Sequence, residues 1–128
     1  MTTDPALFSA TELLHAYARK TLSPVEATKA VLARIDKYDG TFNAFRLVDE
    51  ARALEAARAS EARWVKGVPA GLVDGVPTTI KDLVATKGWS TRRGSLSSSE
   101  DGPWDEDHPL VGKLRAHGAV LLGKLNLT

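Results

Sequence analysis

The sequence predicts an α/β fold in which N-terminal helices precede a βαβ unit. Two serine capping boxes in the first half favour helices there. At Gly67 the composition changes to closely spaced glycines and prolines, which favour loops and strands. Strand-like and helix-like segments then alternate to the end of the chain. We therefore expect a helical region over residues 1–66 and a loop with a βαβ unit over residues 67–128, within one domain.

Three helices are expected in the first half. Ser9 and Ser23 each have a glutamate three residues later, so each is expected to cap the first turn of a helix. The Asp-Gly pair at residues 39–40 is expected to end the second helix. The third helix is expected over about residues 48–65, with Ala51 facing inward.

The second half predicts two strands joined by a helix. Residues 76–81 favour a strand, and the long polar stretch over residues 86–107 favours a functional loop or one that packs against another element. A helix is expected over residues 108–117, closed by a glycine, and a short buried strand over residues 119–122. This order predicts a right-handed crossover and a parallel pair. Two strands alone leave both edges unpaired, so the sheet is expected to be incomplete.

Composition excludes several classes of protein. Of the 128 residues, 17 are basic and 16 acidic, so a net charge of +1 predicts neither a nucleic-acid footprint nor a membrane surface. No apolar run is long enough to cross a bilayer, and we expect a cytoplasmic protein. The chain has no cysteine, which excludes thiol chemistry. No metal is expected, because the histidines lack metal-ligand spacing: His15, His108 and His117.

Residues 118–125 come close to a phosphate-binding loop. The motif needs a hydroxyl at its last position, where this chain has Leu125, and its middle residues are apolar and typical of a buried strand. We therefore expect no nucleotide, and no cofactor of any other kind.

Lys81 is the leading candidate for chemistry. It ends the predicted strand, after a glycine-rich approach and just before Asp82. A lysine in an apolar environment is costly and often has a function. By position alone, however, a strand-end lysine that extends to water or pairs with Asp82 explains the sequence at least as well.

An ordered set of motifs around Lys81 resembles the start of the amidase signature family. The resemblance extends from about Thr11 to Asn126, and its spacing is more specific than any single element. The motifs that carry it are Gly71-Leu72, Asp74-Gly75-Val76-Pro77, Ile80-Lys81-Asp82, Gly88, Thr91, Gly94-Ser95, Asp107, Val111, Leu114-Arg115, Gly118-Ala119-Val120 and Gly123-Lys124, with Asn126.

The resemblance implies an α/β fold with a large mixed sheet wrapped by helices, of which this chain would form the N-terminal, incomplete part. It also implies cleavage of small-molecule carboxylic amides to an acid and ammonia or an amine. The family uses a nucleophilic serine, a second serine in a cis peptide bond, and a lysine; by its motif, Lys81 is that catalytic lysine. A neutral lysine acts as a general base only where burial lowers its pKa.

The resemblance places both catalytic serines downstream of the motif at which this chain ends. The loop serines Ser95 and Ser97–Ser99 lack a glycine-flanked nucleophile turn and are not expected to replace them. Lys81 alone has nothing to deprotonate. We therefore expect the isolated chain to be inactive and to need a C-terminal fragment or a partner chain.

Two alternatives stay open. One is the amidotransferase subunit that delivers ammonia from glutamine to misacylated tRNA, in which case a nucleic acid would become a partner. The other is a non-catalytic module that binds another protein chain through the open sheet edge. No membrane partner is expected under either.

Overall fold

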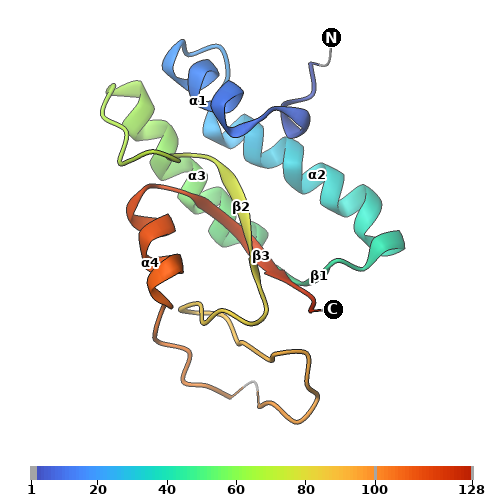
Figure 1. The fold of residues 1–128 in the computed structure, drawn as a ribbon. Coiled ribbons are helices and arrows are strands. Elements are labelled where there is room, and N and C mark those ends of the chain that lie inside the picture. Colours follow the sequence, from blue (N-terminus) through green and yellow to red (C-terminus); the bar gives the residue numbers. More distant parts are fainter. Residues whose placement is uncertain (1–2, 100, 128) are drawn as a thin grey trace.

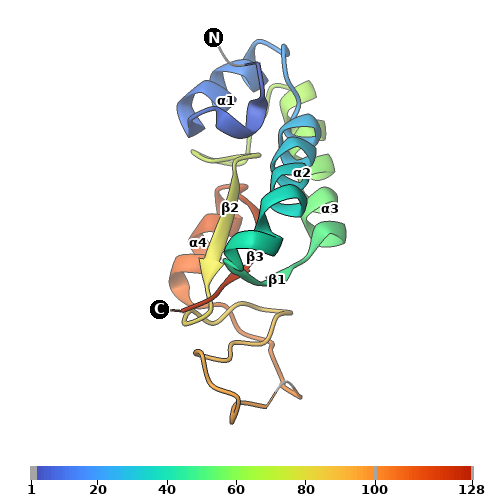
Figure 2. The same ribbon diagram turned by 90° about the vertical axis from the view of Figure 1, so that its right-hand side faces the viewer.

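The computed structural model describes residues 3–99 and 101–127 as helices packed on both faces of a small mixed sheet (Figures 1 and 2). The α/β class expected from the sequence is confirmed. In chain order the elements are η1 (Pro5–Leu7), α1 (Ala10–Ala18), α2 (Pro24–Phe42), β1 (Phe45–Val48), α3 (Glu50–Val65), β2 (Pro77–Lys81), α4 (Pro109–Ala116) and β3 (Val120–Leu125).

Both expected capping boxes are present. Ser9 caps α1 and Ser23 caps α2, each accepting a hydrogen bond from the backbone N–H of the glutamate three residues later. The glutamate side chains, in turn, accept from the N–H groups of the two serines at 2.6 and 2.8 Å. These reciprocal bonds satisfy N–H groups that a helix start leaves without partners.

Two helix boundaries differ from expectation. The Asp-Gly pair at 39–40 does not end α2, which continues to Phe42 and is closed by Asn43 in the left-handed conformation (φ 49°). The third helix begins at Glu50, after Asp49 caps it. Its buried alanines are Ala53 and Ala57, whereas Ala51 is exposed.

The sheet contains a strand that the sequence did not predict. β1 lies in the region expected to be helical and pairs antiparallel with β3, while β2 pairs parallel with β3, giving the order β1-β3-β2. The parallel β2–α4–β3 pair agrees with the expected crossover connection. The strand expected over residues 119–122 is longer and forms the centre of the sheet.

Helices cover the two faces of this sheet differently. Figure 2 shows α2 and α3 on one side of the strands and α4 on the other. Ala53 and Ala57 of α3 pack with Val120 and Leu122, whereas Val111 of α4 packs on the opposite core. That second core contains Ile80, Trp89, Val111, Ala119 and Leu121.

The loop between β2 and α4 projects from the end of the sheet (Figure 1). It contains no helix or strand among its described residues apart from an isolated bridge between Thr86 and Trp89. Within the described part of the chain, no helix is long and apolar enough to cross a membrane.

Candidate functional site

Lys81 is the last residue of the edge strand β2, and its side chain is exposed. Side chains alternate along a strand, so Lys81 points away from the face that carries its buried neighbours Ile80 and Asp82. The carbonyl of Lys81 accepts a hydrogen bond from Val84 N at 3.0 Å, which closes a tight turn after the strand. The described residues do not supply the burial that a neutral lysine requires.

The glycine-rich segment before β2 is held by a buried carboxylate. Asp74 is fully buried and accepts two bonds from the guanidinium of Arg63, from Nε and Nη2, both at 2.7 Å, and one from Ala70 N at 2.6 Å. Next to it, the hydroxyl of Tyr17 donates to the carbonyl of Gly75 at 2.8 Å. The approach to Lys81 is therefore fixed to α1 and α3.

The same contacts shift two pKa values. Burial by itself would raise the pKa of Asp74, but the bonds from Arg63 and Ala70 outweigh it and hold that pKa below its ordinary value. Burial, and then the negative charge of Asp74, raise the pKa of the Tyr17 hydroxyl. The raised pKa favours the neutral hydroxyl, which is the form that donates to the carbonyl of Gly75.

Asp82 is the buried acid that follows Lys81. Its Oδ2 lies 2.7 Å from Arg46 Nε, and its Oδ1 accepts from Arg92 N at 3.3 Å. Its backbone N–H donates to Leu125 O at 2.9 Å and its carbonyl accepts from Arg93 N at 3.0 Å. The acid thus ties the end of β2 to β1 and to the loop at Arg92, and none of these bonds pairs it with Lys81 as the simplest interpretation of the sequence suggested.

The second lysine of this region, Lys124, is completely buried. Its Nζ donates to Val84 O at 2.9 Å, to Thr91 Oγ1 at 2.8 Å and to Thr86 Oγ1 at 3.3 Å. In the sequence, Lys124 belonged to the near-match to a phosphate loop and to the Gly123-Lys124 motif of the family resemblance, and neither gave it a role. The signal that could have found it was a lysine two residues after the predicted buried strand, since a strand that continues to Leu125 buries that charge and requires partners for it.

The environment of Lys124 lowers its pKa. Burial disfavours the ammonium, the carboxylate of Asp82, 3.7 Å away, favours it, and the guanidinium of Arg46 disfavours it again. The balance lies below the ordinary lysine value.

Trp89 fastens the loop to the helical layer. Its indole N–H donates to Asp49 Oδ2 at 2.7 Å, and the guanidinium of Arg52 lies 5.7 Å from its ring centroid. Asp49 also caps α3. One residue therefore begins a helix and anchors the loop that follows Lys81.

The loop serines interact within the loop. Ser95 Oγ and Ser97 Oγ lie 2.6 Å apart, and Ser98 Oγ donates to Arg92 O at 2.8 Å. These bonds tie the loop to itself and place none of the three hydroxyls in contact with Lys81. In the described part of the chain, no group of histidine, aspartate and glutamate side chains could hold a metal ion.

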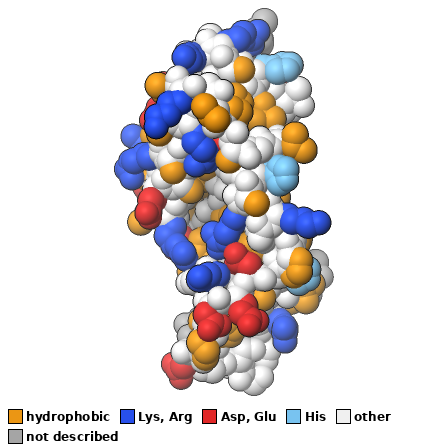
Figure 3. Space-filling view, turned by 90° about the vertical axis from the view of Figure 1, so that its left-hand side faces the viewer, with side chains coloured by type: hydrophobic (Ala, Val, Ile, Leu, Met, Phe, Trp, Pro, Cys, Tyr) orange, Lys and Arg blue, Asp and Glu red, His pale blue; other side chains and the backbone are white. Residues whose placement is uncertain are grey.

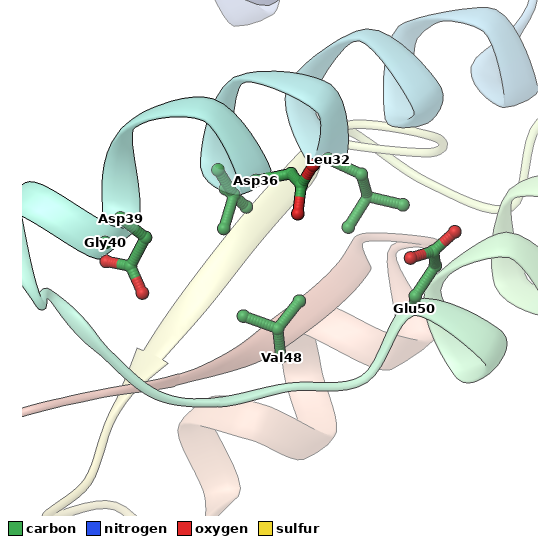
Figure 4. Close-up of a pocket in the computed structure, with 7 residues that line it drawn as sticks. Leu32, Asp36, Asp39, Gly40, Val48 and Glu50 are labelled. Carbon is green, nitrogen blue, oxygen red and sulfur yellow. The ribbon is translucent and has the colours of Figure 1, made fainter.

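Other surface features lie apart from these residues. A cavity between α2 and the start of α3 is lined by three carboxylates, Asp36, Asp39 and Glu50 (Figure 4), but by neither lysine. Asp39 already accepts from the N–H groups of Ala44 and Phe45. Figure 3 shows basic side chains over the middle and upper part of one face and acidic ones near its lower end.

The sequence of this chain matches a known family of proteins. The family described as Amidase matches residues 26–128. The chain belongs to the amidase signature family. It is 43% identical over 125 residues to the A subunit of the Glutamyl-tRNA(Gln) amidotransferase of Salinispora tropica, covering 98% of this chain and 25% of that protein.

Solved structures of amidase signature enzymes share the fold. A bacterial aryl acylamidase superposes with a TM-score of 0.85 at 30% identity, over 93% of this chain and 25% of that one. The peptide amidase of Stenotrophomonas maltophilia gives a TM-score of 0.86 at 30% identity, over 95% and 25%. This amidase signature chain thus spans about a quarter of the length of the relatives it matches.

Proposed function

We propose that this chain provides the lysine-bearing part of an enzyme that hydrolyses carboxylic amides, with Lys81 as the catalytic lysine. The observation that carries the proposal is the position of Lys81 in an amidase signature chain, at the carboxyl end of a strand and before a fixed turn. Active groups are commonly placed at this end of a parallel strand pair.

The proposed role for Lys81 is proton transfer. The resemblance gives the reaction a nucleophilic serine whose proton passes through a bridging serine to the neutral amine of Lys81, and then to the leaving nitrogen. Neither family serine is part of this chain. The rest of the domain would supply both, and would also bury Lys81, whose side chain is exposed here.

Reassembly tests this proposal. Residues 1–128 are produced together with the complementary three quarters of the peptide amidase, and ammonia release from small primary amides is measured. We expect activity with the natural chain and a loss of at least about a thousandfold with Lys81→Met, because removing one member of a catalytic unit removes most of its effect.

Lys113→Met is the matched control. Lys113 is an exposed lysine on α4, so its loss is expected to leave the rate unchanged. If the Lys81→Met pair is as active as the natural pair, Lys81 is not the catalytic lysine.

A second candidate function is that of the amidotransferase, which the 43% identity to the Salinispora tropica protein favours. In that case the amide would be glutamine, and the ammonia would be used rather than released. The same experiment with the complementary part of the amidotransferase protein, together with the other chains of that enzyme, separates the two. Hydrolysis of glutamine in preference to simple amides supports the amidotransferase, and the reverse supports a free-standing amidase.

A further inference from the structure

We propose that Lys124 is a positioning residue for Lys81: its buried side chain clamps the turn that follows β2 and thereby fixes where Lys81 leaves the sheet. The inference rests on the proposed catalytic role of Lys81. It concerns a residue on the central strand, whose partners are 33 to 40 positions earlier in the chain.

The hydrogen bonds of Lys124 match an ammonium group. An ammonium has three N–H donors, and Nζ has three acceptors, on Val84, Thr86 and Thr91. Both threonine hydroxyls are themselves oriented toward the carbonyl of Val84, at 3.0 and 3.5 Å, so their oxygens are free to accept from Nζ. A neutral amine, with two N–H donors, could make only two of these three bonds.

A short chain of bonds joins Lys124 to Lys81. Nζ of Lys124 holds the carbonyl of Val84, and the N–H of Val84 holds the carbonyl of Lys81 at 3.0 Å. In the sheet, Lys124 is the register partner of Ile80, the residue before Lys81. Lys124 therefore constrains Lys81 through the turn that follows it and through the strand residue that precedes it.

A register irregularity between β2 and β3 determines the face of the sheet on which the side chain of Lys124 lies. Thr78 pairs with Leu121 and Ile80 with Lys124, so β3 has one more residue than β2 between these pairs. Without the extra residue, alternation would place Lys124 on the opposite face from Leu121. With it, Lys124 lies on the side of Ile80, above the turn.

The charged groups near Lys124 are Asp82 and Arg46, which also bind each other. Asp82, 3.7 Å from Nζ, is shared with Arg46, and Arg46 also donates through Nη2 to the carbonyl of Ser90. Lys124 is 0% exposed, so a substrate cannot reach it. It acts through the backbone and is not itself a catalytic residue.

The clamp is tested first in the 128-residue chain, by amide hydrogen exchange. We expect Lys124→Met and the milder Thr91→Val to speed exchange at Val84 N and Arg93 N by about tenfold or more, with α2 unchanged, because local opening is governed by local contacts. Thr91→Val keeps the side-chain shape, so it decides the question if Lys124→Met does not fold.

Matched controls are Lys113→Met and Thr28→Val. Lys113 is exposed, and Thr28 is a buried threonine whose hydroxyl has no hydrogen-bond partner among residues 3–99 and 101–127. Neither is expected to change exchange at Val84. If Thr91→Val leaves exchange at Val84 within about twofold of the natural chain, the clamp is disproved.

The effect on catalysis is tested in the protein reassembled with its complementary part. We expect both clamp variants to lower kcat by about ten- to a hundredfold with KM changed less than about twofold, because misplacing a reacting group affects the chemical step more than binding. A merely structural role would lower the amount of folded enzyme and leave kcat per folded molecule unchanged.

The two proposals fail in different ways. If Lys81→Met loses activity while both clamp variants keep the natural kcat, positioning by Lys124 is disproved and the proposed function stands. If Lys81→Met stays active, the proposed function fails, and so does a positioning role toward Lys81, whatever the exchange result.

Discussion

Gly75, on the approach to Lys81, has no room for a side chain and a backbone conformation that favours glycine. It adopts a φ of +85°, and a Cβ there would lie 2.7 Å from Ser60 Oγ and 2.9 Å from both Pro24 Cγ and Tyr17 Cε2. We expect Gly75→Ala to lower the free energy of unfolding by about 2–3 kcal/mol, from strain and overpacking together. Urea denaturation followed by circular dichroism measures it.

Gly112 provides the comparison. It lies inside α4, and nothing would contact an added Cβ within 4 Å. Gly112→Ala should raise stability by up to about 1 kcal/mol, because alanine is the better helix former. Equal effects at the two positions would show that the close approach at Gly75 is unimportant.

The lowered pKa of Asp74 makes the free energy of unfolding depend on pH. Its lowered pKa means that the unfolded chain takes up a proton at a higher pH than the folded chain does, near the ordinary value of 3.8. The stabilisation is therefore complete above that value and is lost as the pH falls through the lowered one. We expect Asp74→Asn to cost about 2–3 kcal/mol at neutral pH and to flatten this acid dependence.

Asp107→Asn is the matched substitution. Burial raises the pKa of Asp107, but bonds from Lys87 N and Arg115 outweigh this and lower it. This pair is more exposed, so we expect a loss below about 1 kcal/mol. Denaturation between pH 3 and 7 compares the two; a larger loss at Asp107 would contradict the assignment of Asp74 as the structural anchor.

Lys81 and Lys124 differ in how much of their environment the sequence could predict. Lys81 could be singled out because its motif is local, within residues 71–82. Lys124 could not be understood in the same way, because its acceptors lie between Val84 and Thr91 and are brought to it only by sheet pairing. Its burial is a property of the fold.

Elements whose signals are local were predicted well. Both capping boxes involve residues three apart, and the helices that they begin are present. β1 was missed because it has only four residues and its partner, β3, is more than seventy positions away. The end of α2 was misplaced because Gly40 remains helical and Asn43 supplies the left-handed residue.

The hydrogen bond of the Ser23 cap is expected to stabilise α2. Ser23→Ala removes the acceptor for Glu26 N, 3.1 Å away, and should cost about 1 kcal/mol. Ser97→Ala, in the exposed loop, should change stability by less than about 0.5 kcal/mol. Thermal denaturation of both variants gives the comparison, and similar shifts would mean that the cap contributes little.

The molecule as a whole presents a groove between the sheet and the elements η1, α1 and α2. Residues from these helices and from all three strands line it, among them Leu13, Ile35, Phe45, Thr79 and Leu122. Within the described part of the chain, β2 pairs on one side only. Since the chain spans about a quarter of its relatives, we expect the rest of the domain to pack here.

Association tests that expectation. Thr79→Glu places a charge on the wall of the groove and should weaken binding of the complementary three quarters of the peptide amidase by at least about tenfold, because an unpaired charge resists burial. Thr41→Glu, on the exposed end of α2, should have no effect. Calorimetric titration measures both affinities, and equal weakening would place the interface elsewhere.

The sheet order also determines when the sheet can form during synthesis. β3 pairs with both other strands and is the last of the three to leave the ribosome, because synthesis proceeds from the N-terminus. Until residues 120–125 emerge, β1 and β2 have no strand between them. A nascent chain arrested before that point should therefore contain helices but no sheet, and the turn that carries Lys81 should be ordered only afterwards.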